Sequence, residues 1–191
     1  TRAVYPFAFV LDVHYEIAGA TLTVRVDVTN EEPRRAMPFS FGFHPALRWP
    51  LHPGTPKDAH DLLFSHPEIA TVARPRDGFL APQREANPVD ADRVLHLRDA
   101  MFEAGALIFD TLASDAVRYR TGDGSSVRIS FSGMPHLGIW SKPGAPFVCI
   151  EPWPGFAAPE GFAGELGDKP GIIQLAPGAR HSFKMLLSVA N

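Results

Sequence analysis

The chain has 191 residues, of which 45% are hydrophobic and 20% are charged, so it is too apolar for a disordered polypeptide and long enough for one substantial core. Its formal net charge of -3 is spread along the sequence without a run of lysine or arginine, which argues against a nucleic-acid partner held by phosphate contacts. No apolar stretch is long enough to span a bilayer, so no membrane partner is predicted, and the single cysteine is compatible with a reducing, cytoplasmic location.

The dominant period along the chain is two residues, which is typical of β-strands. Segment 7–17 alternates apolar and polar side chains, as a half-buried strand does, and 22–29 repeats the pattern, so the two are predicted to form a hairpin. Residues 99–103 are predicted to form one helical turn, and the proline-rich segments 51–58 and 74–92 are predicted to be loops. Further short strands are predicted at 61–65, 70–73, 94–97, 106–112, 117–119, 127–131, 137–140, 147–151, 172–175 and 182–189.

Many short strands separated by turn residues predict an all-β chain, built as a sandwich or a barrel. No internal repeat and no interdomain linker is recognisable, so residues 1–191 are predicted to form a single domain. The 19 prolines and 16 glycines, scattered between the apolar runs, supply the turns that this architecture needs.

The segment around Glu151 carries the first candidate for chemistry. Strand alternation places Phe147, Cys149 and Glu151 on one face, and Pro152 is predicted to end the strand because it has no N–H to donate. A carboxylate at the end of a strand is well placed to face a cleft. The alternative is a solvated or ion-paired surface residue, which is the more common fate of a glutamate in a β protein.

The second candidate is His44. Residues 40–44 are predicted to form a strand that ends at Pro45, with Ser40, Gly42 and His44 on one face, where the small residues leave room for a ligand against the sheet. A carboxylate and an imidazole together can move protons on a polar substrate without a cofactor. The alternative for His44 is a buried histidine that is hydrogen-bonded to the backbone.

The remaining candidates are less specific. Trp140 ends a predicted strand and Trp153 follows Pro152, and such tryptophans are more often packing residues than ligand platforms. Neither His60 nor His66 has a third ligand at metal-like spacing, so no metal site is predicted. Cys149 has no base beside it in the sequence and is predicted to be a small strand hydrophobe.

Several segments, spread in order over nearly the whole chain, form a specific combination of motifs. They are Tyr-Pro-Phe at 5–7, Met-Pro-Phe-Ser-Phe-Gly-Phe-His-Pro at 37–45, Leu-Gly-Ile-Trp-Ser-Lys-Pro at 137–143, Phe-Val-Cys-Ile-Glu-Pro-Trp at 147–153 and Lys-Pro-Gly-Ile-Ile-Gln-Leu at 169–175. This combination resembles the aldose 1-epimerase (galactose mutarotase-like) family, in particular its LacX-like branch.

The resemblance implies a mutarotase on an antiparallel β-sandwich whose concave face holds a hexose. By that carry-over Glu151 is the general base that takes the proton of the anomeric hydroxyl, and His44 is the general acid that protonates the ring oxygen. Trp153 and Trp140 become candidate sugar-binding residues, and Asp110 a candidate acceptor for a sugar hydroxyl. No metal and no other cofactor is implied.

The chain also departs from the family. Its relatives carry a further N-terminal segment before the Tyr-Pro-Phe motif, with an arginine and a histidine that hold the sugar, so this chain resembles the C-terminal two-thirds of the family domain. Where relatives have acidic residues, 103–106 reads Glu-Ala-Gly-Ala. An N-terminally truncated sandwich is expected to expose a strand edge and an apolar face, which favours homo-oligomers. The alternative function is a carbohydrate-binding remnant that has lost turnover.

Overall fold

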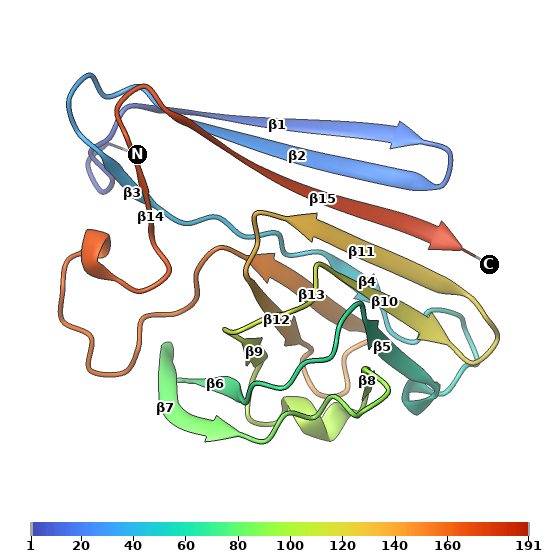
Figure 1. The fold of residues 1–191 in the computed structure, drawn as a ribbon. Helices are drawn as coiled ribbons and strands as arrows, with labels where there is room; N and C mark the ends of the chain where they lie inside the picture. Colours follow the sequence, from blue (N-terminus) through green and yellow to red (C-terminus); the bar gives the residue numbers. More distant parts are fainter. Residues whose placement is uncertain (1, 191) are drawn as a thin grey trace.

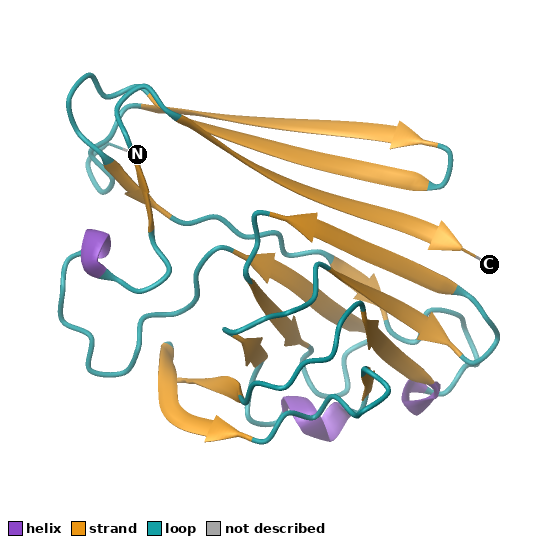
Figure 2. Ribbon diagram, viewed as in Figure 1, coloured by secondary structure: helices purple, strands orange, loops and turns teal. Residues whose placement is uncertain are grey.

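The computed structural model describes residues 2–190, which contain fifteen β-strands and three single-turn 3-10 helices (Figures 1 and 2). All the strand pairs within its sheets are antiparallel, so the prediction of an all-β, antiparallel chain is confirmed. The helices are η1 (Lys57–Ala59), η2 (Asp99–Phe102) and η3 (Leu166–Asp168). The helical turn predicted at 99–103 is therefore confirmed, and the other two were missed. Within residues 2–190, no helix is long and apolar enough to cross a membrane.

The strands form two large sheets and one small one. The seven-stranded sheet has the order β1 (Phe9–Ala18), β2 (Thr21–Asn30), β15 (Arg180–Ala190), β11 (Ser126–Ser132), β10 (Ala116–Thr121), β5 (His60–Phe64) and β8 (Val94–His96). The six-stranded sheet has the order β4 (Ala46–Arg48), β13 (Phe147–Trp153), β12 (His136–Trp140), β9 (Leu107–Phe109), β6 (Val72–Arg76) and β7 (Phe79–Glu85). The small sheet pairs β14 (Ile173–Leu175) with β3 (Met37–Phe39).

The main core lies between the two large sheets. It takes buried side chains such as Ile129 and Phe183 from the seven-stranded sheet and Leu137 and Ile150 from the six-stranded sheet. Burial of these apolar faces is the principal driving force of the fold. Because alternate residues of a strand point to opposite faces, the side chains that flank Ile150 in β13 project from the other face of the six-stranded sheet.

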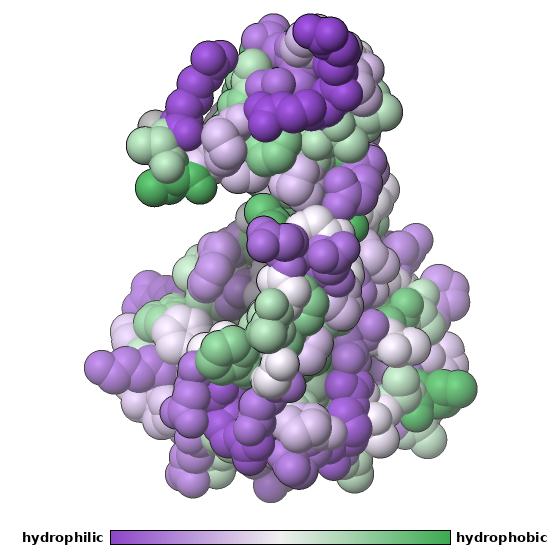
Figure 3. All heavy atoms as spheres, turned by 90° about the vertical axis from the view of Figure 1, so that its left-hand side faces the viewer, coloured by the Kyte–Doolittle hydropathy of each residue, from purple (hydrophilic) through white to green (hydrophobic). Residues whose placement is uncertain are grey.

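The β1–β2 hairpin forms as predicted, with Gly19 at a positive φ of 57° in its turn. The prediction of a half-buried first strand is wrong for its distal part, where Tyr15 and Ile17 are 71% and 79% exposed. Their cross-strand neighbours Val24 and Leu22 lie on the core-facing side of β2, but no described residue covers β1 there. The hairpin projects away from the six-stranded sheet in Figure 1, and Figure 3, seen from the opposite end, shows the indentation between this upper part and the rest of the molecule. An exposed apolar face is thus present, while homo-oligomerisation stays a prediction.

The segment 74–92 was predicted to be a loop, and this is wrong, because it contributes to the β6–β7 hairpin. The turn between these strands is Asp77-Gly78, and both residues have positive φ angles, of 51° and 84°. An Asp-Gly pair in this conformation is a favoured two-residue hairpin turn. The prolines in the segment obscured the strands, since Pro75 lies at a register shift and Pro82 lies on β7, the edge strand of the sheet.

Candidate active site

His44 and Glu151 face each other across two adjacent segments. The pairing of β4 with β13 sets Ala46 opposite Cys149, and continuing this register places His44 opposite Glu151. Two backbone hydrogen bonds, from Phe43 N to Pro152 O at 3.1 Å and from Ile150 N to Pro45 O at 3.2 Å, confirm the register on either side. His44 and Glu151 are therefore a non-hydrogen-bonded pair, the type in which side chains approach most closely.

Both prolines were predicted to end a strand, and both predictions are wrong. Residues 40–45 are extended but are not a strand, β4 begins after Pro45, and β13 continues through Pro152 to Trp153. In an antiparallel pair the N–H and C=O of one residue point to the same neighbour. The carbonyl of Pro152 accepts from Phe43, so its missing N–H costs one bond on that side only, and its pairing with Leu137 of β12 is unaffected.

The two side chains form a close acid–base pair. His44 Nε2 lies 3.4 Å from Glu151 Oε2, and the side chains are 60% and 7% exposed, respectively. Burial raises the pKa of Glu151 above its ordinary value, while the adjacent imidazole of His44 lowers it by a smaller amount. A raised pKa makes the ionised Glu151 a stronger proton acceptor than a solvated glutamate.

The same face of the six-stranded sheet carries the other aromatic candidates. In the β12–β13 pair, Trp153 lies opposite His136 and Cys149 lies opposite Trp140, and directly paired residues share a face. The structure therefore brings both predicted tryptophans onto the face of Glu151. It adds His136, which the sequence analysis did not select. His136 directly precedes the predicted strand 137–140, and its pairing with Trp153 could be recognised only from the register of β12 and β13.

Trp153 fills the space directly over Gly42, and the room predicted beside the small residues is a cavity next to the ring, lined in part by Ser40 and Gly42. A Cβ atom at Gly42 would lie 2.5 Å from Trp153 Cδ1, and one at Gly138 would lie 2.4 Å from Trp153 Cη2. The indole thus lies across two glycines, one in the extended segment and one in β12. These glycines are needed because any side chain at either position would displace the ring.

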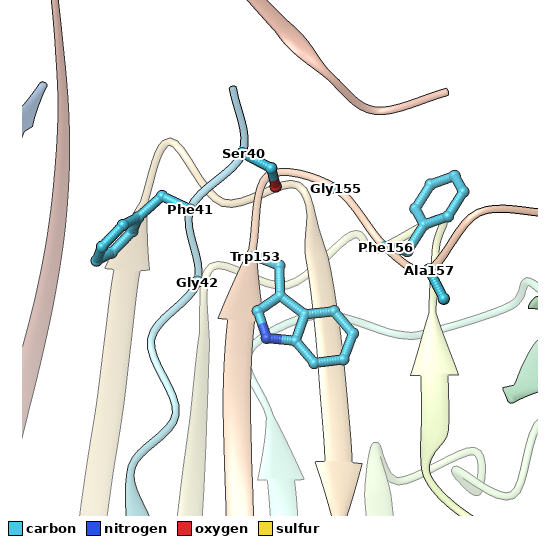
Figure 4. Close-up of a pocket in the computed structure, with 7 residues that line it drawn as sticks. All are labelled: Ser40, Phe41, Gly42, Trp153, Gly155, Phe156 and Ala157. Carbon is cyan, nitrogen blue, oxygen red and sulfur yellow. The ribbon is translucent and has the colours of Figure 1, made fainter. Parts of the chain in front are cut away.

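This cavity has a volume of about 320 Å³, and Trp153 is one of its lining residues. Figure 4 shows Trp153 at its floor, Phe41 pointing away from it, and the segment 155–157 along its rim. Ser40 Oγ donates a hydrogen bond to Pro154 O at 2.8 Å, which ties the two sides of the cavity together. The lining of this cavity includes Trp153 but neither His44 nor Glu151.

A hydrogen bond fixes the tautomer of the His136 ring beside that cavity. Its Nδ1 accepts a hydrogen bond from Gly155 N at 2.9 Å, which leaves Nε2 as the donor of the neutral ring. Burial lowers the pKa of His136, an effect that the charge of Asp110 partly opposes. The ring is therefore neutral near pH 7 and suited to hydrogen bonding.

Asp110 directly follows β9 and binds the side chain of an arginine. Arg84 of β7 contacts both of its carboxylate oxygens. Alternation from Ile108, which is opposite Gly138, puts Asp110 on the same face as Glu151. The bidentate Arg84 fixes the orientation of the carboxylate and offsets its charge.

Cys149 also lies at the candidate site, although the sequence analysis predicted only a small strand hydrophobe. It is buried and has no disulfide partner, as expected for a strand hydrophobe. Yet its Sγ, a ring nitrogen of His44 and a carboxylate oxygen of Glu151 all lie within 4.8 Å of one another. Burial and the nearby Glu151 carboxylate raise the pKa of Cys149 to about 11, so the free thiol is neutral and a poor nucleophile.

With this geometry in place, the family can be decided by comparison with known proteins. The family model described as Aldose 1-epimerase matches residues 1–188. The chain belongs to the aldose 1-epimerase family. Protein LacX of Lactococcus lactis subsp. lactis, encoded on a plasmid, is 30% identical over 177 residues, which cover 91% of this chain and 59% of LacX.

Two solved structures share the fold of this chain. A galactose mutarotase related enzyme from Lactobacillus acidophilus has a TM-score of 0.86 at 30% identity, and the match covers 100% of this chain and 64% of that one. A galactose mutarotase-like protein from Lactobacillus casei has a TM-score of 0.83 at 26% identity, with 97% and 65% covered. The chain thus spans less than two thirds of the length of these relatives.

Proposed function

We propose that this chain is a cofactor-independent aldose 1-epimerase, a mutarotase that interconverts the α and β anomers of a hexose. The observation that carries the proposal is the His44–Glu151 pair, with 3.4 Å between Nε2 and Oε2. The two reacting oxygens of a cyclic sugar, the anomeric hydroxyl and the ring oxygen, are bonded to the same carbon. An acid and a base that lie side by side are therefore suited to serve both atoms.

The proton transfers follow from the properties of the pair. Glu151 takes the proton of the anomeric hydroxyl while protonated His44 donates to the ring oxygen, and the bond from C1 to that oxygen breaks. The open-chain aldehyde rotates about its C1–C2 bond. Reclosure returns one proton from Glu151 to the new anomeric oxygen and the other from the ring oxygen to His44. The sugar leaves as either anomer, and both side chains regain their starting states.

Other residues of the same face are proposed to bind the sugar. Trp153 and Trp140 offer aromatic surfaces, and neutral His136 offers a hydrogen-bond donor at Nε2. Asp110 offers acceptor oxygens whose orientation Arg84 fixes. Since Trp153 rests on Gly42 and Gly138, its ring is held rigidly, which lowers the entropic cost of binding.

One feature favours a second candidate, a carbohydrate-binding protein without turnover. The His44 side chain is 60% exposed, so in the described residues the proposed acid lies on an open surface and not in an enclosed cavity. Exclusion of water ordinarily strengthens catalysis by such groups. This arrangement favours binding over fast chemistry.

Two measurements on one protein sample separate the candidates. Sugar binding is followed by the fluorescence of the tryptophans, and anomer exchange by polarimetry of freshly dissolved galactose and glucose. A mutarotase accelerates exchange, and His44→Gln lowers the rate by about 100- to 10,000-fold. The matched control is His96→Gln, because His96 also lies beside a carboxylate, Asp90, at 3.5 Å and is similarly exposed. Binding without acceleration would support the second candidate instead.

A further inference from the structure

Three side chains of different chemistry converge at the candidate active site. Cys149 and Glu151 project from the same face of β13, two residues apart, and His44 reaches them from the adjacent segment. One ligand atom from each lies within 4.8 Å of the other two, and within residues 2–190 no other group of three potential metal ligands converges in this way.

The chemistry of the three donors selects the class of ion. Thiolate, imidazole and carboxylate are the ligands that Zn²⁺ takes in proteins, whereas Ca²⁺ and Mg²⁺ take oxygen ligands. Soft thiolate donors also discriminate against these hard ions. We propose that His44, Cys149 and Glu151 form a Zn²⁺ site, and that Zn²⁺ bound there inhibits the protein.

The geometry leaves only a small movement to be made. Zinc bond lengths of ~2.0 to 2.3 Å place the ligand atoms of a tetrahedral site roughly 3.3 to 3.7 Å apart. The pair of His44 Nε2 and Glu151 Oε2, at 3.4 Å, already meets this spacing. The two distances to Cys149 Sγ are no longer than 4.8 Å. Cys149 and Glu151 are buried in the strand, while the His44 ring is exposed and can rotate toward Cys149.

The site would hold three protein ligands and leave a fourth position open. On binding, the Cys149 thiol loses its proton to solvent and a Zn–S bond forms, while imidazole and carboxylate bind without a change of covalent structure. The open position faces the side on which His44 is exposed, so a water molecule or a sugar hydroxyl can occupy it.

The inhibitory effect rests on the proposed function, whereas the binding itself does not. A metal that holds both Glu151 and His44 removes the general base and the general acid together. We therefore expect Zn²⁺ to slow anomer exchange, and sugar to compete with Zn²⁺ for the open face.

Direct binding is the test that does not depend on turnover. Zn²⁺ binding to the purified chain is measured by titration calorimetry, and Co²⁺ serves as a spectroscopic probe because a thiolate ligand gives it a charge-transfer band. We expect one ion per chain and a thiolate band. Loss of an outer-shell partner alone lowers metal affinity about 10- to 100-fold, so loss of the Cys149 ligand in Cys149→Ser is expected to lower it by at least that factor.

Two further variants keep the test independent of any folding defect in Cys149→Ser. His44→Gln removes an exposed ligand and should weaken the binding of Zn²⁺ to a similar degree. His96→Gln removes a histidine of matched exposure beside a carboxylate with no cysteine nearby, and should leave the affinity unchanged. Absence of binding, or binding that survives both Cys149→Ser and His44→Gln, would overturn the proposal. An active enzyme that Zn²⁺ does not bind refutes this site alone, and an inactive chain that binds Zn²⁺ refutes the proposed function alone.

Discussion

At the scale of single residues, the burial of Glu151 determines both its basicity and the amount by which the ionised side chain lowers the stability of the fold. Glu151 is buried, and burial raises its pKa, so the folded state binds the proton more tightly than the unfolded state does. Wild-type stability should therefore fall as the pH rises from the ordinary glutamate pKa to the raised value of Glu151. Above this window the ionised side chain lowers stability, although the contact with His44 offsets part of that loss.

We accordingly expect Glu151→Gln to be more stable than the wild type at neutral pH. The difference should shrink as the pH falls through the same window and vanish once Glu151 is protonated in both states. Urea denaturation of both proteins at pH values from about 4 to 8 measures it. A variant that is less stable at neutral pH would show that the pairing with His44 outweighs burial, contrary to this account.

The glycines beneath Trp153 provide a second prediction at this scale. In Gly138→Ala the added Cβ would lie 2.4 Å from the indole, so the ring must move, at a cost of about 1 to 3 kcal/mol in the free energy of unfolding. Anomer exchange should slow as well, because the ring no longer lies beside Glu151 in its native position. Gly122→Ala is the matched control, since no atom lies within 4 Å of the Cβ it would add. Equal stability and activity of the two variants would contradict the assigned role of Gly138.

At the scale of elements, strand alternation predicted which side chains share a face of a strand better than it predicted where each strand ends. It placed Cys149 and Glu151 on one face and identified the first hairpin correctly. Alternation also predicted that two strands end at prolines, although both prolines take part in strand pairing. Each proline lacks only the hydrogen bond that its N–H would donate, because its carbonyl still accepts one from the facing segment and its other neighbour is unaffected. The approach of His44 to Glu151 was beyond a single sequence, since it depends on the register between segments more than a hundred residues apart.

Alternation also failed to tell a covered apolar face from an uncovered one. Ile129 of β11 and Ile17 of β1 both lie on apolar faces of strands, yet they are 0% and 79% exposed. Ile129→Ala should lower the free energy of unfolding by about 2 to 5 kcal/mol, because it leaves a cavity in the core. Ile17→Ala should change it by less than about 1 kcal/mol. Chemical denaturation compares them, and similar losses would show that β1 is buried in solution.

At the scale of the whole molecule, the two large sheets have different roles. Their facing surfaces form the core, and the opposite face of the six-stranded sheet carries His44, Glu151 and Trp153. The sequence predicted this division in outline through its family resemblance, and the family match confirms the resemblance. The contributions of Cys149 and His136 were missed because nothing in the sequence around either residue marks it as part of a site. Only the strand pairing shows that both lie on the face of Glu151.

Glu151 is proposed to act as the base of an anomer exchange reaction. Its most direct test is the exchange rate of freshly dissolved galactose and glucose, followed by NMR with wild-type protein and with Glu151→Gln. The amide keeps the size of the side chain but cannot accept the proton, so the enzyme-dependent rate should fall by about 100- to 10,000-fold. A wild-type rate that Glu151→Gln leaves unchanged would contradict the account.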